Sequence, residues 1–479
     1  MTGMNEDPGA LLPELLLLAG AVFGLLLGSW LPRHRQYLVR WLAAGAAVAG
    51  MVTTVVAAGR PDEVVFGTSY SVDTLTNATR MIVLAAVLIT LALSADATAG
   101  HRRETEFVVL LQLGALGAIV LGGANDLLLL FAAFLLASVP FYALAGWDKQ
   151  ARGTEAAMKY YLSGAFLGVA MLAGIAVLYG VGRSTAYGPL RDGLGVAPAA
   201  AAAAGLVALL AGLLFKAGAV PAQFWVPDVT DGTPAPVAAI VTTIPKIGAL
   251  VAMLRLLLVA VPPEAVDWSL LIAILAAASM TLGNLAAFFQ TSVQRLLAYS
   301  TVSQVGYLLM AVAVAGRTHL AQPALLFYLA AYAVTNLGAF AVVAELPRAR
   351  TLQDYRGLAR RHPGLATVLV VCLFGLIGTP PTAVFVGKLT VFAAAIDGGL
   401  GWLTVLAVVN TVASVFYYLR WIAPSFRAVD AAAPSLVLQR AGTWSTRTAY
   451  AAAVVSLLLG VASGVILPML DGGPMVVGR

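Results

Sequence analysis

Apolar stretches recur along the whole chain, and short polar segments separate them. A helix needs roughly 20 mainly apolar residues to cross the hydrocarbon core of a bilayer, and these stretches are long enough. The pattern predicts fourteen membrane-spanning helices with no soluble domain between them. The expected spans are residues 11–31, 38–58, 75–95, 106–124, 127–146, 156–180, 200–221, 236–260, 268–289, 296–315, 321–345, 364–397, 401–424 and 447–469.

The composition agrees with an all-α, polytopic membrane protein. Apolar residues make up 61% of the chain and charged residues 10%, and the mean hydropathy of +0.92 is far above that of a soluble domain. The single cysteine, Cys372, excludes a disulfide framework, a cysteine-ligated iron–sulfur cluster and a structural zinc site. The four histidines lie between the apolar stretches, which leaves no buried pair for haem. We therefore expect no catalytic residue, cofactor or metal in this chain.

Basic residues gather in alternate loops, namely those after the first, third, fifth, eleventh and thirteenth expected spans. The positive-inside rule places these loops in the cytoplasm and both termini on the outer side, which requires an even number of spans. The net charge of +6 thus reflects topology and predicts the lipid bilayer, not nucleic acid, as the surroundings. We expect a multi-pass protein of the cell (plasma) membrane.

Lysine follows a different pattern from arginine. The chain has only five lysines, and Lys216, Lys246 and Lys388 lie inside expected spans, whereas arginine lies almost always between them. A lysine at the bilayer centre costs roughly 2.5–3.5 kcal/mol, so it indicates a functional site. A desolvated lysine can release its proton, which arginine cannot. The pattern predicts a proton path, although Lys246 could instead extend its ammonium to the membrane interface.

Two of these spans also contain prolines that break a helix. Pro221 follows Lys216 in the seventh span, and Pro380 and Pro381 precede Lys388 in the twelfth. Proline interrupts a helix, and lipid tolerates this only where protein or water covers the gap. Because the two breaks lie five spans apart, they predict two inverted five-helix repeats around a transport pathway. A simple packing kink is the alternative for either proline site.

The repeats divide the chain into four parts. We expect the first three transmembrane helices in residues 1–100 and the first repeat, helices 4–8, in residues 101–260. The second, inverted repeat, helices 9–13, takes residues 261–425. Residues 426–479 then form a loop and the fourteenth helix.

Ordered motifs between about residues 70 and 425 carry a family resemblance. They include Glu155-Ala156-Ala157-Met158-Lys159, Phe215-Lys216, Pro227-Asp228-Val229, Gly283-Asn284-Leu285, Asn336-Leu337-Gly338, Asp354-Tyr355-Arg356-Gly357 and Gly378-Thr379-Pro380-Pro381. In this order and spacing the chain resembles the antiporter-like membrane subunits of respiratory complex I, and most of all the N subunits of bacterial NADH-quinone oxidoreductase.

The resemblance implies a subunit that translocates protons while its partners carry out the redox chemistry. FMN, iron–sulfur clusters and quinone would belong to partner subunits, and the other membrane-arm subunits would be its neighbours. In the family, lysines of the seventh, eighth and twelfth spans form a polar axis, and these roles would fall on Lys216, Lys246 and Lys388. Glu155 and Lys159 match a charged pair of the family, although a surface salt bridge is an equal alternative.

The chain departs from the family at four titratable positions. A glutamate of the fifth span is replaced by Leu135, two histidines by Gln223 and Gln304, and a lysine by Gln294. Without the glutamate, Lys216 should be neutral more often, or should rely on water or another carboxylate. Our hypothesis is a divergent paralogue whose proton conduction is weakened or altered.

Two other functions stay open at this point. The chain could belong to a related cation/proton antiporter or membrane-bound hydrogenase, whose membrane subunits share this fold. It could also complete a membrane arm without pumping, because the helix-5 glutamate is replaced by Leu135.

Overall fold

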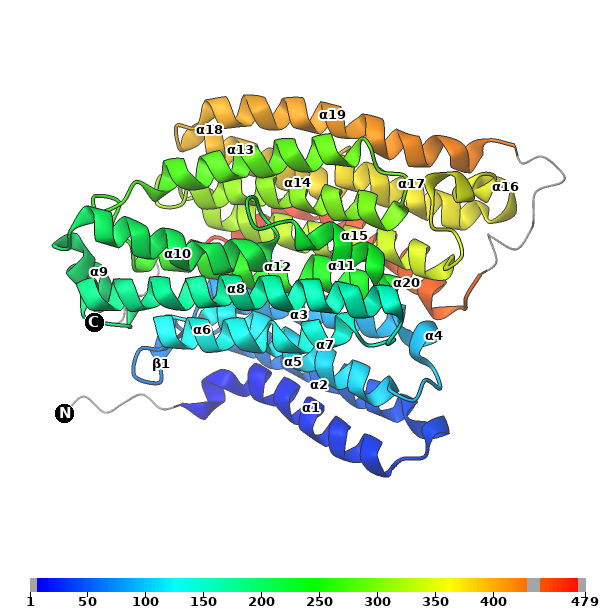
Figure 1. Ribbon diagram of the computed structural model, residues 1–479, viewed down its shortest axis with the longest axis horizontal. Coiled ribbons are helices and arrows are strands. Elements are labelled where there is room, and N and C mark those ends of the chain that lie inside the picture. The colour runs from blue at the N-terminus through cyan, green and yellow to red at the C-terminus, as the bar shows by residue number, and fades with distance from the viewer. Residues whose placement is uncertain (1–6, 429–439, 473–479) are drawn as a thin grey trace.

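The computed structural model describes residues 7–428 and 440–472. The described chain is almost entirely helical, and most of the long helices lie side by side along one direction (Figure 1). The long helices are α1 (Leu12–Trp30), α2 (Tyr37–Ala57), α3 (Thr74–Leu93), α5 (Glu104–Gly123), α8 (Ala151–Gly182), α10 (Ala199–Ala217), α12 (Ala235–Val259), α13 (Trp268–Ala287), α14 (Val293–Ala313), α15 (Ala321–Glu345), α17 (Pro363–Ile377), α18 (Ala383–Asp397), α19 (Gly401–Phe426) and α20 (Trp444–Val461). The shorter ones are α4 (Ala95–Thr98), α6 (Leu127–Leu136), α7 (Val139–Ala145), α9 (Tyr187–Gly195), α11 (Trp225–Gly232), α16 (Leu358–Arg361) and α21 (Ser463–Met469), with 3₁₀ turns η1 (Pro8–Leu11), η2 (Arg33–Arg35) and η3 (Leu352–Tyr355).

The predicted class, a helical polytopic membrane protein, is confirmed. In the described part of the chain, twelve helices are long and apolar enough to cross a membrane, and thirteen if α20 and α21, which meet at 77°, form one span. The expected twelfth span is divided into α17 and α18, each of 15 residues. A total of fourteen counts these two as one crossing, and it stays a prediction.

Burial separates the central helices from the peripheral ones. The apolar windows of α12, α14 and α15 are 100%, 94% and 94% buried inside the protein, whereas those of α1 and α2 are 39% and 28% buried. A helix that is apolar on all sides is stable only when protein or lipid surrounds it completely. The three central helices therefore form the core, and the N-terminal helices pack at its edge (Figure 1).

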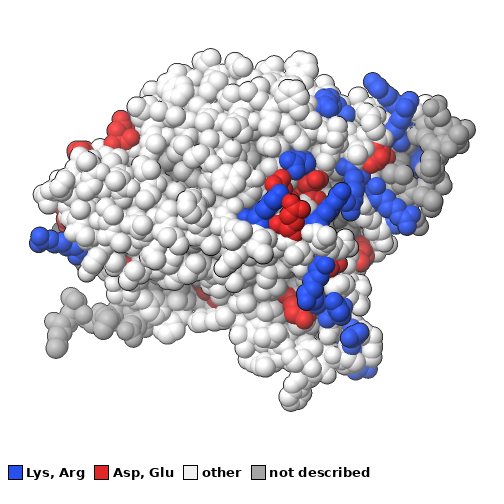
Figure 2. Space-filling model, in the orientation of Figure 1, with Lys and Arg blue, Asp and Glu red and all other residues white. Residues whose placement is uncertain are grey.

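Charge is concentrated at one end of the molecule. Lysine and arginine gather where α4 and α16 lie, and few charges line the sides of the helices (Figure 2). The alternate loops that carry the basic residues thus lie at the same end, which we call the basic end.

A small hairpin lies at the opposite end. Strands β1 (Glu63–Val65) and β2 (Tyr70–Val72) pair antiparallel, with Val64 opposite Ser71. The turn is joined to the end of α5, because the amide of Asn125 donates to the carbonyl of Ser69 at 2.8 Å. The hydropathy pattern did not predict these short strands.

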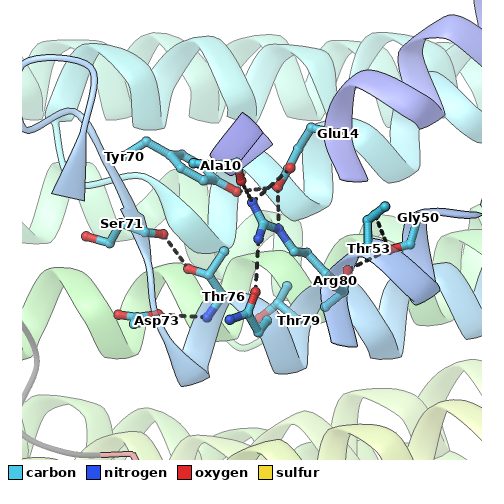
Figure 3. Close-up of polar contacts among 12 residues, drawn as sticks. Ala10, Glu14, Gly50, Thr53, Tyr70, Ser71, Asp73, Thr76, Thr79 and Arg80 are labelled. Atoms are coloured by element: carbon cyan, nitrogen blue, oxygen red, sulfur yellow. Dashed lines mark hydrogen bonds and ion pairs between the residues drawn. The ribbon is translucent and has the colours of Figure 1, made fainter. Parts of the chain in front are cut away.

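Arg80 is one of two arginines that the structure buries inside spans. It lies on α3, and its Nε and Nη2 donate to the two carboxylate oxygens of Glu14 on α1 at 2.7 and 2.9 Å. The hydroxyl of Tyr70 donates to the same carboxylate at 2.6 Å, and the carbonyl of Ala10 accepts from Nη2 at 2.8 Å (Figure 3). This cluster ties the first helix to the hairpin and to α3.

Arg255 on α12 forms the second buried cluster. Its Nη1 and Nη2 hold both oxygens of Asp73 at 2.7 and 2.8 Å, and its Nε donates to the carbonyl of Gly122 at 3.0 Å. A bidentate arginine–carboxylate pair has a fixed geometry, so it fixes the start of α3 and the end of α5 against α12.

We expect Asp73→Ala to destabilise the protein by about 3–5 kcal/mol, because it leaves the buried guanidinium of Arg255 without its counter-charge. The measurement is the free energy of unfolding of the purified chain in detergent. Asp192→Ala, at an exposed aspartate, is the control and should have little effect. The double variant Asp73→Leu/Arg255→Leu should recover most of the loss, and a double variant as unstable as Asp73→Ala would contradict the assignment.

Candidate functional site

The segment that follows α10 interrupts the seventh expected span. Helix α10 ends at Ala217, and Gly218 adopts a left-handed backbone conformation with φ of 75°. The amides of Gly218 and Ala219 both donate to the carbonyl of Leu214, which closes the helix end. Pro221 lies in the connection to α11.

The twelfth expected span is interrupted in the same way. Helix α17 ends at Ile377, Gly378 has φ of 89°, and the amides of Gly378 and Thr379 donate to the carbonyl of Phe374. Pro380 and Pro381 lie in the connection to α18. Both breaks therefore combine a left-handed glycine with a proline a few residues later.

A third break lies in the fifth span, where the sequence predicted a continuous helix. Helix α6 ends at Leu136, and α7 begins at Val139. Pro140 has no backbone N–H to donate to the preceding turn, which explains why the helix is interrupted here. The proline inside an apolar stretch was the available signal. The break leaves the carbonyl of Ala137 at the C-terminus of α6.

Lys216 contacts this third break. It lies on α10 and is fully buried, and its Nζ donates to the carbonyl of Ala137 at 3.1 Å and to the hydroxyl of Ser138. Nζ also lies 4.9 Å from the ring centre of Phe134 and 5.7 Å from that of Tyr142. With the ring centre of Phe215 at 5.9 Å, the ammonium is enclosed by one helix end, one hydroxyl and three aromatic rings.

Lys246 contacts the first break. It follows Pro245 on α12, is fully buried, and donates from Nζ to the carbonyl of Ala217 at 2.7 Å. The ring centre of Trp225 lies 5.6 Å from Nζ. The ammonium does not reach an interface, which excludes the snorkelling alternative for this residue.

Lys388 contacts the second break. It lies on α18, and its Nζ donates to the carbonyl of Ile377, the last residue of α17, at 2.8 Å. The hydroxyl of Thr411 lies 3.5 Å away, and the ring centre of Tyr307 lies 4.2 Å from Nζ. All three lysines therefore place the ammonium on a carbonyl at the C-terminus of an interrupted helix.

The C-terminus of a helix carries a partial negative charge, because its last carbonyls lack partners within the helix. Among the ion pairs of the described residues, none includes Lys216, Lys246 or Lys388. Lys216 was expected to rely on water or on another carboxylate. Among the described residues, its Nζ hydrogen-bonds a helix end and a hydroxyl and no carboxylate, and its reliance on water stays a prediction.

Side chains of α14 and α15 occupy the space between the lysines. Gln304 donates to the carbonyl of Leu376 at 2.7 Å and accepts from the hydroxyl of Tyr328 at 2.5 Å. Tyr332 donates to the carbonyl of Thr242 on α12 at 2.9 Å and lies 3.0 Å from the hydroxyl of Thr301. Two groups of uncharged polar side chains therefore lie on the central helices, one at the end of α17 and one against α12.

The other departures from the family lie away from these polar side chains of α14 and α15. Leu135 is 44% exposed on the outer side of α6, one turn before Ser138. Gln294 donates to the carbonyls of Thr230 and Thr233 at 3.0 and 3.1 Å, and the side-chain oxygen of Gln223 is buried without a partner. Gln294 thus hydrogen-bonds backbone carbonyls, the side-chain oxygen of Gln223 has no partner, and neither residue pairs with a charged group.

The charged pair that the sequence singled out lies at the protein surface. Lys159 contacts Glu155 at 2.9 Å and Asp228 at 3.0 Å, and Arg295 contacts Asp228 at 3.0 Å. The side chains of Glu155 and Lys159 are 66% and 47% exposed. This network lines a cavity of about 220 Å³. It is separate from the three buried lysines.

No group of three or more histidine, cysteine, aspartate or glutamate side chains in the described ranges could hold a metal ion.

Comparison with known proteins assigns the chain to a family. Residues 124–414 match the family described as NADH:quinone oxidoreductase/Mrp antiporter, TM. The chain is 63% identical to NADH-quinone oxidoreductase subunit N 1 of Streptomyces griseus subsp. griseus, over 97% of this chain and 98% of that one. It is 49% identical to subunit N of Mycobacterium sp. (strain JLS), over 94% and 96%. A chain of respiratory complex I from Thermus thermophilus, solved with bound aureothin, matches with a TM-score of 0.82 at 34% identity, covering 96% of this chain and all of that one.

The protein is therefore a member of the NADH:quinone oxidoreductase/Mrp antiporter membrane family. Within that family it belongs to the N subunits of NADH-quinone oxidoreductase, the antiporter-like subunits of the membrane arm of complex I. The resemblance recognised from the sequence motifs is confirmed.

The glycines at two breaks give a direct test of the lysine contacts. A Cβ on Gly218 would lie 2.6 Å from Nζ of Lys246, and one on Gly378 would lie 2.8 Å from Cδ of Lys388. Gly399 also has a positive φ, of 80°, but a Cβ placed on it would have no atom within 4 Å.

We expect Gly399→Ala to lose about 1–2 kcal/mol from backbone strain alone. Gly218→Ala and Gly378→Ala should lose more, because they also push a lysine off its helix end. The measurement is the unfolding free energy in detergent. Equal losses at all three positions would show that the lysine contacts contribute nothing.

Proposed function

We propose that this chain translocates protons through Lys216, Lys246 and Lys388, while partner subunits carry out the electron transfer that drives the movement. The observation that supports this most directly is that each lysine is buried and rests on a helix end without a carboxylate. Intramembrane lysines are rare because they are expensive, and those that persist mark ion or proton routes.

The contacts suit a proton that must be gained and lost. The hydroxyl of Ser138 beside Lys216 can both accept and donate a proton. The amide of Gln304 cannot titrate, but it can orient water or a hydroxyl, and it already bonds Tyr328. Proton movement past Gln304 would therefore use hydroxyl groups and water in place of an imidazole.

The remaining assignments follow from the same proposal. FMN, iron–sulfur clusters and quinone reside in partner subunits, and this chain holds none of them. The chain is multi-pass in the plasma membrane, with the basic end in the cytoplasm and both termini outside, as the positive-inside rule requires. Residues 101–260 and 261–425 act as two inverted units, flanked by three helices in residues 1–100 and by a loop and one helix in residues 426–479. Glu155 and Lys159 belong to the proton route at its basic end.

Lys388→Ala is the sharpest variant, because Thr411 and Ile377 are the only groups that its Nζ hydrogen-bonds in the described structure. A positioned proton-transfer group contributes roughly 10²–10⁴-fold to a step that it limits. We therefore expect a loss of about a hundredfold, the lower part of that range, in proton pumping by the assembled complex in vesicles. Lys216→Ala should reduce proton pumping to a similar extent.

Lys149→Ala, at an exposed lysine of the basic end, is the matched control and should pump normally. Assembly of each variant is checked by the amount of intact complex. Normal pumping by well-assembled Lys216→Ala and Lys388→Ala complexes would favour a structural subunit that does not pump. Cation-dependent proton exchange without electron transfer would favour the antiporter alternative.

Leu135→Glu tests whether the missing carboxylate has altered conduction. We expect the new anion, one turn before the Ser138 that Lys216 contacts, to change the rate or the coupling of proton pumping, because an anion stabilises the charged form of a nearby lysine. Leu128→Glu, two turns earlier and also exposed on α6, is the control. Unchanged rate and coupling in the Leu135→Glu complex would reject the hypothesis of a divergent, weakened copy.

A further inference from the structure

A groove unrelated to the lysines opens at the basic end between α2, α3 and α20. It encloses about 620 Å³, and its walls come from residues that are far apart in the sequence. The groove is lined by, among others, Arg40, Trp41, Ala44, Leu88, Asp96 and Trp444. In a chain that spans a membrane, such a groove at a helix end faces the boundary between hydrocarbon and headgroups.

The groove changes from polar to apolar with depth. Helix α2 begins at Tyr37, so Arg40 lies about 4.5 Å and Ala44 about 10 Å along the helix at a rise of 1.5 Å per residue. Trp41 and Trp444 meet edge to face with ring centres 6.2 Å apart. Tryptophan is enriched at headgroup level. Below it the walls are alanine and leucine side chains, including Leu88.

The mouth carries one cation and one anion, each with unused hydrogen-bonding capacity. Arg40 bonds Glu104 and Thr98 through Nη2, which leaves its Nη1 without a hydrogen-bond partner among the described residues. Asp96 accepts from the amide of Ser445 through Oδ2 at 3.0 Å, and no residue in the described ranges donates a hydrogen bond to its Oδ1. A phosphate fits the guanidinium, and a primary ammonium fits the free carboxylate oxygen.

We propose that this groove binds one phosphatidylethanolamine molecule from the surrounding leaflet. Its phosphate contacts Arg40, its ammonium contacts Asp96, and an acyl chain lies along Ala44 and Leu88 between α2 and α3. Phosphatidylcholine presents a trimethylated ammonium that cannot donate to Asp96, and phosphatidylglycerol presents no cation. The order of charge, aromatic ring and apolar wall therefore selects an aminophospholipid. This site does not depend on the proposed proton route.

Native mass spectrometry of the full-length chain tests the site, in micelles that hold equal amounts of phosphatidylethanolamine, phosphatidylglycerol and phosphatidylcholine. We expect one phosphatidylethanolamine to be retained about tenfold more than either of the other two lipids, which is 1.4 kcal/mol of selectivity. Ala44→Trp should fill the groove and abolish this retention. Val48→Trp, one turn along α2 and 49% exposed outside the groove, should not.

Asp96→Asn keeps an acceptor for Ser445 but removes the charge, so it should lose the preference over phosphatidylglycerol while still retaining a phospholipid. Glu106→Gln, an exposed carboxylate at the same end, should keep the preference. Equal retention of the three lipids by the unmodified chain would overturn the proposal. So would Ala44→Trp behaving like Val48→Trp, or a polypeptide segment of a partner subunit filling the groove in the assembled complex.

Discussion

A lysine ammonium resting on the carbonyl end of an interrupted helix is the interaction on which this structure depends. It occurs three times, at Ala137, Ala217 and Ile377, and each instance requires a break in a span that hydropathy alone would leave continuous. The left-handed glycines and the prolines serve these breaks, because a continuous helix would satisfy its own carbonyls. The central helices then enclose the exposed ends in protein, which lipid requires.

The magnitudes explain why this arrangement suits a mobile charge. Burying a lysine in the membrane costs roughly 2.5–3.5 kcal/mol, whereas a helix end returns about 0.3–1 kcal/mol and up to about 2 in favourable geometry. The helix end therefore offsets only part of the cost of burying the protonated lysine, so the lysine can still release its proton. Arg80 and Arg255 show the opposite design, since each has a full carboxylate partner and cannot lose its proton. The two arginines fix helices against one another, whereas the three lysines are the groups through which we propose that protons move.

Sequence reasoning found what depends on local pattern and missed what depends on distant partners. The spans, Lys216, Lys246 and Lys388 were visible because a charge or a proline stands out in an apolar stretch. The ion pair of Arg255 with Asp73 spans 182 residues and leaves no local signal. The break before Pro140 was missed because, unlike Pro221 and Pro381, this proline has no lysine in the same span. Without it, the helix end that replaces the expected carboxylate of Lys216 could not be foreseen.

The most direct measurement is a structure of the assembled complex at a resolution that shows ordered water around the three lysines. The account predicts Nζ of Lys216, Lys246 and Lys388 close to the carbonyls of Ala137, Ala217 and Ile377, near the 3.1, 2.7 and 2.8 Å found here. Water should connect these sites along α14 and α15. A carboxylate of a neighbouring subunit within 4 Å of these ammonium groups (about the limit for an ion pair), or uninterrupted helices at the three breaks, would contradict it.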